Sequence, residues 1–154
     1  MKVLFVCLGN ICRSPSAEGV FRRAVEQAGL EQRITVDSCG IGDWHAGNPP
    51  DERAQAAAKR RGIDISDLRA RQLGREDFAE FDYILPMDYG NLRDIRAMEP
   101  DAHDAHIELF LAFAGMPQGE VPDPYYGGEQ GFEEVLDMIE AASQGLVEHI
   151  QAAG

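Results

Sequence analysis

The sequence predicts an α/β fold of three layers, in which helices cover both faces of a parallel sheet. Two observations support this prediction. Residues 2–7 form a continuous apolar run, as expected for a strand that is buried on both faces. Further along the chain, short apolar or β-branched segments alternate with amphipathic ones, which is the order produced by successive right-handed βαβ crossovers.

The first half of the chain contains two strands and two helices. After the strand at residues 2–7, residues 14–28 predict a helix, with serine as N-cap, proline at the first helical position and glycine just past its end. Residues 34–38 alternate and are β-branched, which predicts the second strand. Residues 40–50 are rich in glycine and proline and predict a loop. The alanine-rich residues 51–61 predict the second helix, with acids at its start and bases at its end.

The second half continues the alternation. Residues 83–87 predict the third strand, and residues 91–98 predict a helix. Residues 107–113 predict a fourth strand, with a helix as the alternative. Residues 131–151 predict the closing helix.

Composition narrows the class of protein. A chain of 154 residues with 44% hydrophobic and 27% charged residues is typical of one globular domain, so we expect a single domain over residues 1–154, with a monomer as the default. No apolar run approaches the roughly 20 residues that span a bilayer, and the amino-terminal run is too short for an export signal. Three cysteines cannot all pair internally, which favours a reducing, cytoplasmic location.

The net charge restricts the partners. A formal net charge of -13 argues against nucleic acid, because binding to nucleic acid depends on neutralising phosphates with Lys and Arg. An acidic protein can still bind one phosphate group where a cation and backbone amides are concentrated. We therefore expect any anion site to be a local one.

The loop after the first strand has the features of such a site. It reads Cys7-Leu8-Gly9-Asn10-Ile11-Cys12-Arg13-Ser14 and runs directly into the first helix. Ligands of parallel sheets bind beyond the carboxyl ends of the strands, where this loop lies. A tight loop at a helix N-terminus points several backbone N–H groups inward, and the helix dipole adds to their attraction for an anion.

Three side chains of this loop are candidates for phosphate binding, for nucleophilic attack and for stabilising the nucleophile. The guanidinium of Arg13 matches two phosphate oxygens. The amides, the dipole and this cation all favour the thiolate form of Cys7, which would attack the phosphorus of a bound dianion in line. The hydroxyl of Ser14 would hydrogen-bond that thiolate and steady it as a leaving group.

A second motif lies far along the chain, in the glycine-flanked loop Asp123-Pro124-Tyr125-Tyr126. Cleavage of a phosphate ester expels a poor leaving group, which a carboxylic acid can protonate. Asp123 is the candidate acid, and it would then serve as the base that activates water.

The two motifs together resemble one family. Val-Cys-x-Gly-Asn-Ile-Cys-Arg-Ser-Pro, followed much later by Asp-Pro-Tyr-Tyr-Gly, is similar to the low-molecular-weight protein tyrosine phosphatases, and the resemblance runs through nearly the whole chain. It implies a phosphotyrosine phosphatase I-like fold with a four-stranded parallel sheet of order 2-1-3-4. It also implies hydrolysis of phosphotyrosine proteins and small aryl phosphates through a phosphocysteine intermediate, with no metal or cofactor, and inhibition by phosphate or vanadate-like oxyanions.

The resemblance also implies roles for individual residues. Cys7 is the nucleophile, Arg13 binds the phosphate and Asp123 is the general acid and base. Asn10 holds the shape of the loop, in which Gly9 contributes to phosphate binding, and Ser14 stabilises the thiolate. The resemblance further implies that the walls of the entrance favour an aromatic phosphoester, and that they are formed by Leu8, Ile11, Trp44, Tyr125 and Tyr126. It also implies that Cys12 can trap an oxidised nucleophile as a disulfide.

Several alternatives stay open at the level of sequence. Many family members carry a histidine where this chain has Leu68, so any tuning through that histidine is absent. Cys39 is read as a buried small hydrophobe. An arsenate reductase of the same fold is a competing activity, although it requires further cysteines near the third strand, and residues 80–95 contain none. A phosphotyrosine-binding module that has lost turnover is a third possibility.

Overall fold

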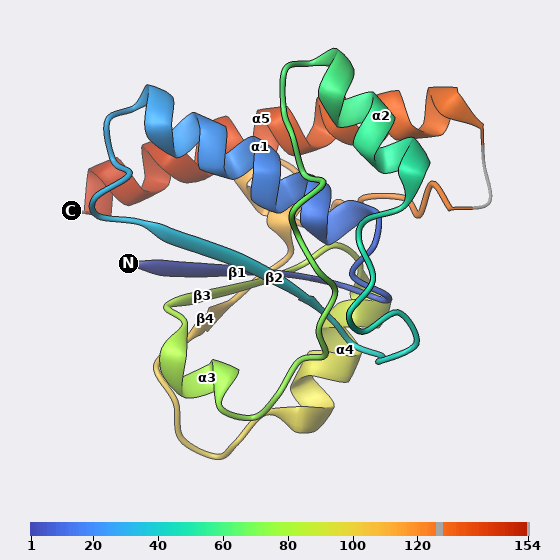
Figure 1. The fold of residues 1–154 in the computed structure, drawn as a ribbon. Coiled ribbons are helices and arrows are strands. Elements are labelled where there is room, and N and C mark those ends of the chain that lie inside the picture. The colour runs from blue at the N-terminus through green and yellow to red at the C-terminus, as the bar shows by residue number, and fades with distance from the viewer. Residues whose placement is uncertain (126–127, 154) are drawn as a thin grey trace.

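The computed structural model describes residues 1–125 and 128–153, and these form a parallel sheet between two layers of helices (Figure 1). The strand order is β2-β1-β3-β4, as expected, and every adjacent pair is parallel. The strands are β1 (Lys2–Cys7), β2 (Thr35–Gly40), β3 (Tyr83–Pro86) and β4 (His106–Ile107). The helices are α1 (Arg13–Gln27), α2 (Glu52–Arg60), α3 (Asp77–Glu80), α4 (Tyr89–Met98), a 3₁₀ helix η1 (Phe110–Ala114) and α5 (Glu129–Ala153).

The side chains of β1 alternate between two cores, which confirms that this strand is buried on both faces. Val3 and Phe5 belong to the larger cluster, formed with α1 and α5. Leu4 and Val6 belong to a smaller cluster on the opposite face, formed with α3 and α4. Figure 1 shows the same division, with α1, α2 and α5 above the sheet and α3 and α4 below it. Because helices cover both faces of the sheet, the loops at the ends of its strands are the parts left accessible to a ligand.

The start of α1 differs from the sequence prediction. The helix begins at Arg13, Cys12 is the N-cap residue, and no side chain caps it, so the prediction that Ser14 is the N-cap was wrong. The hydroxyl of Ser14 instead lies 3.0 Å from the sulfur of Cys7. The serine is used by the loop that precedes the helix, and therefore it is not available to cap the helix.

The fourth strand is much shorter than residues 107–113. Only His106 and Ile107 pair with β3, and the chain then turns into η1, so that neither a strand nor an α-helix fills the predicted segment. The reason is packing, because Phe110 and Leu111 are fully buried in the cluster formed with α5. An edge strand continued in the same direction would leave these side chains outside that core.

The other elements follow the prediction within two residues at each end, except that α3 was not anticipated. This helix has only four residues and follows a turn in which the N–H of Gly74 donates to Asp77 at 2.8 Å. Cys39 is fully buried in the smaller cluster, as its interpretation as a hydrophobe required. Leu68 packs against the larger cluster.

Candidate active site

A cavity of about 290 Å³ opens at the carboxyl end of β1. It lies between the loop that joins β1 to α1 and two segments that are remote in sequence. Its lining includes most of the site residues proposed from sequence, namely Cys7, Leu8, Gly9, Ile11, Cys12, Arg13, Trp44, Asp123 and Tyr125, together with His45. The structure therefore brings the cysteine loop and the Asp-Pro corner to one place, and Tyr126 lies outside the described residues.

The sulfur of Cys7 lies in the loop among hydrogen-bond donors. The backbone N–H of Asn10 donates to it at 3.2 Å, and the hydroxyl of Ser14 lies 3.0 Å away. Cys7 itself is only 3% exposed, next to the first turn of α1. The sulfur therefore lies next to an N–H donor, a hydroxyl group and the N-terminal end of α1.

Asn10 fixes the shape of this loop. It is the one described non-glycine residue with positive φ, at 58°. Its Nδ2 donates to the hydroxyls of Ser14 at 2.8 Å and Ser38 at 3.0 Å, and its Oδ1 accepts from the N–H of Arg71 at 3.0 Å. Asparagine tolerates the left-handed conformation, and the three hydrogen bonds account for its selection over glycine.

Gly40, at the end of β2, supports the loop from behind, and sequence reasoning missed it. A Cβ at this position would lie 3.0 Å from the carbonyl carbon of Gly9 and 3.0 Å from the oxygen of Leu8. The next two N–H groups, of Ile41 and Gly42, donate to the carbonyls of Cys7 and Leu8 at 2.9 and 3.0 Å. Only a residue without a side chain allows this close approach. The signal in the sequence was a glycine that closes the second strand.

Arg13 is 3% exposed and is oriented by two acceptors. Its Nη1 donates to Oδ2 of Asp88 at 2.7 Å and to the carbonyl of Val121 at 3.0 Å. Its Nη2 lies 3.7 Å from the carboxylate of Asp123. Burial opposes the charge, but the surrounding anions outweigh it and raise the pKa of Arg13 above its usual value. Arg13 therefore stays charged although it is buried.

Asp88 was also missed from sequence. It is the N-cap of α4, where its Oδ1 accepts from the N–H of Asn91 at 2.7 Å, and its other oxygen holds Arg13. An aspartate before a helix is an ordinary N-cap signal, and that signal predicts a local role only. Its second role depends on β3 lying next to β1 in the sheet.

Asp123 lies at the rim of the cavity. Its side chain is 38% exposed, and its Oδ1 accepts from the backbone N–H of Tyr125 at 3.0 Å. Its other oxygen faces the guanidinium of Arg13. A bound oxyanion would compete for that guanidinium, which leaves the carboxyl group of Asp123 near the outer side of the anion.

Three large apolar or aromatic side chains that line the cavity are partly exposed. Leu8 is 43% exposed, Tyr125 38% and Trp44 67%. The indole of Trp44 lies over Gly42, where an added Cβ would fall 1.9 Å from the ring. His45 packs against Gly9 in the same way, at 3.1 Å from such a Cβ. Gly42 thus leaves room for the ring of Trp44, and Gly9 leaves room for that of His45.

The surroundings of Cys12 disfavour its thiolate form. It is 5% exposed, and burial, followed by the negative charges of Asp51, Cys7 and Asp123, raises the pKa of Cys12 well above its usual value. Cys12 is therefore a neutral thiol at physiological pH. All three cysteines of the chain are free.

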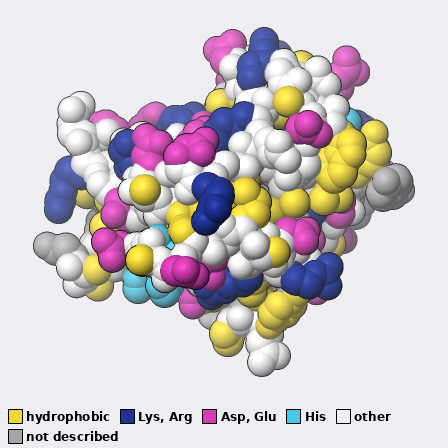
Figure 2. Space-filling model, turned by 90° about the horizontal axis from the view of Figure 1, so that it is seen from below, with side chains coloured by type: hydrophobic (Ala, Val, Ile, Leu, Met, Phe, Trp, Pro, Cys, Tyr) yellow, Lys and Arg dark blue, Asp and Glu magenta, His cyan; other side chains and the backbone are white. Residues whose placement is uncertain are grey.

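Three further properties of the described residues concern metal ions, membranes and surface charge. Within residues 1–125 and 128–153, no three His, Cys, Asp or Glu side chains gather in a way that would hold a metal ion. No helix in this part of the chain is both long and apolar enough to cross a bilayer. On the face shown in Figure 2, acidic and basic side chains are interspersed rather than gathered into one basic patch.

Fold and site together define an α/β protein of three layers, with a cavity built around the cysteine loop between β1 and α1. A family model described as low molecular weight phosphotyrosine protein phosphatase matches residues 2–154. The low molecular weight phosphotyrosine protein phosphatase of Schizosaccharomyces pombe is 49% identical over 97% of each chain. The chain belongs to the low molecular weight phosphotyrosine protein phosphatase family and is an enzyme of the phosphatase class.

Solved structures agree with this assignment. A protein tyrosine phosphatase from Entamoeba histolytica, crystallised with Hepes in its active site, is similar with a TM-score of 0.94 and 38% identity, over 99% of this chain and 98% of that one. A Drosophila protein described as an arginine phosphatase is similar with a TM-score of 0.92 and 33% identity, over 98% of each chain. The same architecture therefore carries more than one described specificity.

Proposed function

We propose that this protein hydrolyses phosphotyrosine in proteins, and small aryl phosphates, through a phosphocysteine intermediate on Cys7. One observation carries the proposal. A buried sulfur with an N–H donor and a hydroxyl on it shares a cavity with a charged Arg13 and with the carboxylate of Asp123. Nucleophile, anion receptor and proton donor are thereby within reach of one phosphate group.

Binding places the phosphate dianion in the loop. The oxygens of the phosphate accept hydrogen bonds from the backbone N–H groups of the loop and from the guanidinium of Arg13. The dipole at the N-terminus of α1 adds to the attraction for the anion. The apolar walls, which include Leu8, Trp44 and Tyr125, hold the aromatic ring of the substrate. We assign Ile11 to the same wall and Gly9 to close approach of the loop backbone.

The first chemical step transfers the phosphoryl group. The thiolate of Cys7 attacks phosphorus, a sulfur–phosphorus bond forms and the bond from phosphorus to the phenolic oxygen breaks. Asp123, protonated at this stage, gives its proton to the departing oxygen so that a neutral phenol leaves. Asn10 holds the loop in shape during this step, and Ser14 donates its hydroxyl hydrogen to the sulfur.

The second step regenerates the enzyme. Asp123, now a carboxylate, takes a proton from a water molecule as the water oxygen attacks phosphorus. The sulfur–phosphorus bond breaks, its electron pair returns to the thiolate of Cys7, and inorganic phosphate leaves. Phosphate monoester hydrolysis can require accelerations near 10²¹, about 29 kcal/mol, while a general acid contributes about 10²–10⁴. Most of the acceleration therefore falls to the loop and the positioned sulfur.

Two variants test the mechanism. Cys7→Ser should abolish turnover of p-nitrophenyl phosphate and of a phosphotyrosine peptide, while vanadate still binds. Cys39→Ala is the matched control, since Cys39 is also buried and free, and it should retain turnover. Acid quenching of the wild-type reaction should yield a phosphorylated peptide containing Cys7 in mass spectrometry. A phosphorylated residue elsewhere would refute the assignment.

A second experiment concerns the acid and the substrate. Asp123→Asn should lower the turnover rate by about 10²–10⁴ with a smaller effect on affinity. Phosphotyrosine and phosphoarginine peptides of one sequence should be compared, because one similar structure is described as an arginine phosphatase. Faster hydrolysis of the phosphoarginine peptide would contradict the substrate that we propose. Turnover should be unaffected by a chelator, since no metal takes part.

The free cysteines favour a reducing location, so we propose that the protein is cytoplasmic. We also propose that it is a monomer and that residues 1–154 form a single domain. We further propose that Cys12 can form a disulfide with an oxidised Cys7. Tyr126 is proposed as a second aromatic wall residue beside Tyr125. Size-exclusion chromatography with light scattering tests the monomer.

A further inference from the structure

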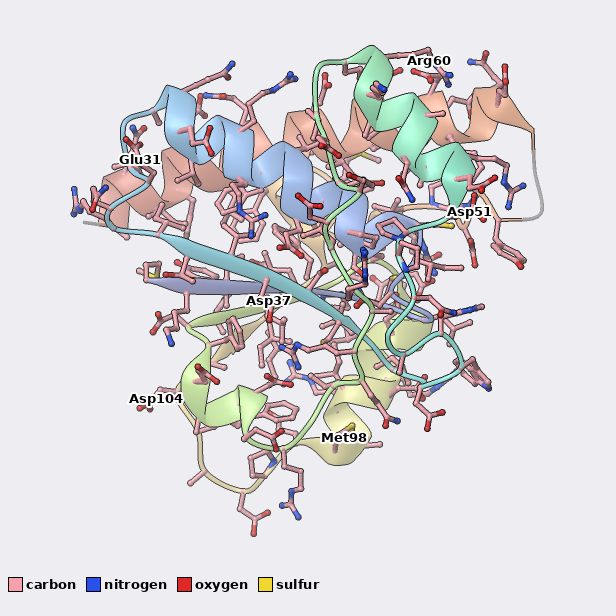
Figure 3. The ribbon with its side chains drawn as sticks, viewed as in Figure 1. Glu31, Asp37, Asp51, Arg60, Met98 and Asp104 are labelled. Carbon is pink, nitrogen blue, oxygen red and sulfur yellow. The ribbon has the colours of Figure 1, made fainter. Side chains whose placement is uncertain are left out.

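The start of α2 is joined to the cysteine loop by a direct contact. The backbone N–H of Asp51 donates to the carbonyl of Ile11 at 2.8 Å, and the carboxylate of Asp51 caps α2 by accepting from the N–H of Arg53 at 2.8 Å. The label of Asp51 in Figure 3 marks this end of α2, and that of Arg60 marks the other. The first turn of α2 is therefore fixed relative to the loop.

The guanidinium of Arg53 pairs with the same carboxylate. Its Nε and Nη2 donate to the two oxygens of Asp51, each at 3.0 Å. This is the planar, two-pronged pairing that arginine makes with a carboxylate. The plane and the position of the guanidinium follow from the position of Asp51.

Two aromatic rings lie against this guanidinium. Its central carbon is 5.3 Å from the centre of the Tyr125 ring and 5.0 Å from that of Phe132, a buried residue of α5. Both distances are within the range of cation–π attraction. Phe132 gives Arg53 a firm neighbour in the core, and Tyr125 is the ring that also forms a wall of the cavity.

Tyr125 in turn contacts the proposed acid. Its backbone N–H donates to Oδ1 of Asp123 at 3.0 Å. A continuous chain of contacts thus runs from the loop carbonyl at Ile11, through Asp51 and Arg53, to the ring of Tyr125 and the carboxylate of Asp123. It links the part of the site that holds phosphate to the part that protonates the leaving group.

We propose that Arg53 is a positioning residue of the reaction, which holds Tyr125 on the cavity wall and thereby keeps Asp123 aligned with the leaving-group oxygen. The inference rests on the role of Asp123 in the proposed function. Arg53 does not line the cavity, so its effect reaches the substrate through Tyr125. Tyr125 and Asp123 lie in a loop without helix or strand of its own, and such a loop needs an external support to hold one geometry.

The test uses two leaving groups, because alignment of an acid matters more when the leaving oxygen is more basic. Arg53→Gln should lower kcat/KM for phenyl phosphate by about tenfold, and that for p-nitrophenyl phosphate by about twofold. The parameter kcat/KM is chosen because it reports the step in which the leaving group departs. Arg53→Lys keeps the charge but loses the planar face, so it should show the same unequal loss to a smaller degree. Equal losses on both substrates, or none, would overturn the inference.

A matched control and a double variant separate positioning from general destabilisation. Arg60→Gln removes another arginine of α2, paired with Glu133 at 2.7 Å and remote from the cavity, and it should leave the ratio of the two kcat/KM values unchanged. In an Asp123→Asn background, Arg53→Gln should have no further effect on that ratio. A full additional effect there would show that Arg53 does not act through Asp123.

The same experiment distinguishes the two proposals from each other. If Asp123→Asn alone leaves the ratio unchanged, the assignment of Asp123 as acid fails, and the role of Arg53 fails with it. If Asp123→Asn changes the ratio and both Arg53 variants do not, only the inference about Arg53 is refuted. Thermal unfolding of each variant accompanies the kinetics, so that a loss of folded protein is not read as a loss of alignment.

Discussion

Replacing Asn10 with alanine should weaken both the stability of the fold and the activity of the site. Asn10 is 3% exposed, and its side chain makes three hydrogen bonds, to Ser14, Ser38 and the N–H of Arg71. At about 1 kcal/mol each, their loss lowers the free energy of unfolding by about 3 kcal/mol. The left-handed backbone, with φ of 58°, adds about 1 kcal/mol for alanine.

Asn10→Gly is the matched variant. It loses the same three hydrogen bonds and avoids the penalty of the left-handed conformation, but glycine gives the unfolded chain more freedom. Glycine should therefore be the more stable of the two by about 0.5 kcal/mol, with both variants at least about 2 kcal/mol below wild type. Urea unfolding, with equal slopes for the three proteins, measures these differences.

The kinetic consequence follows from the same geometry. The N–H of Asn10 donates to the sulfur of Cys7, so a displaced loop misplaces the nucleophile, and a shift of about 1 Å can cost about 10²-fold in kcat/KM. An alanine variant as stable as the glycine variant would contradict the argument from backbone conformation. A loss below about 1 kcal/mol in both would contradict the hydrogen-bond argument.

Three further predictions concern the anion receptor, an entrance wall and the ion pairs of Glu133 that connect the end of α2 to α5. Arg13→Lys should lower kcat/KM about 10²-fold or more, since lysine cannot donate in a fixed plane, and activity near wild type would contradict its role. Gly42→Ala should displace the ring of Trp44, seen as a change in its fluorescence and a higher KM for aryl phosphates. Hydrogen bonds from Arg60 and then Arg61 lower the pKa of Glu133. The stabilisation from these pairs is therefore present above the ordinary carboxyl pKa and is lost as pH falls through the depressed one. Glu133→Gln should therefore cost about 0.5–1 kcal/mol at neutral pH and nothing in acid, measured by urea unfolding.

Much of the fold could be predicted from local patterns. The apolar run of β1, the β-branched alternation of β2 and the capped, alanine-rich α2 gave element types that the structure confirms. Boundaries failed where tertiary contacts competed with local preference. Ser14 is a favourable N-cap by residue type, yet its hydroxyl lies beside the sulfur of Cys7. Phe110 was predicted to lie in a strand, but it lies in η1 and its ring is buried in the core formed with α5.

The sequence by itself determined the loop and its chemistry, because Cys7, Asn10, Arg13 and Ser14 lie within eight residues, and a tight turn before a helix brings near neighbours together. Only the tertiary structure decided what surrounds that loop. Asp88, Gly40 and the Asp51–Arg53 pair come to the site because β1 lies between β2 and β3 and because α2 packs on α5. Residue spacing reports contacts over one or two turns of chain. It contains no information on which distant segments the packing of a sheet will place side by side.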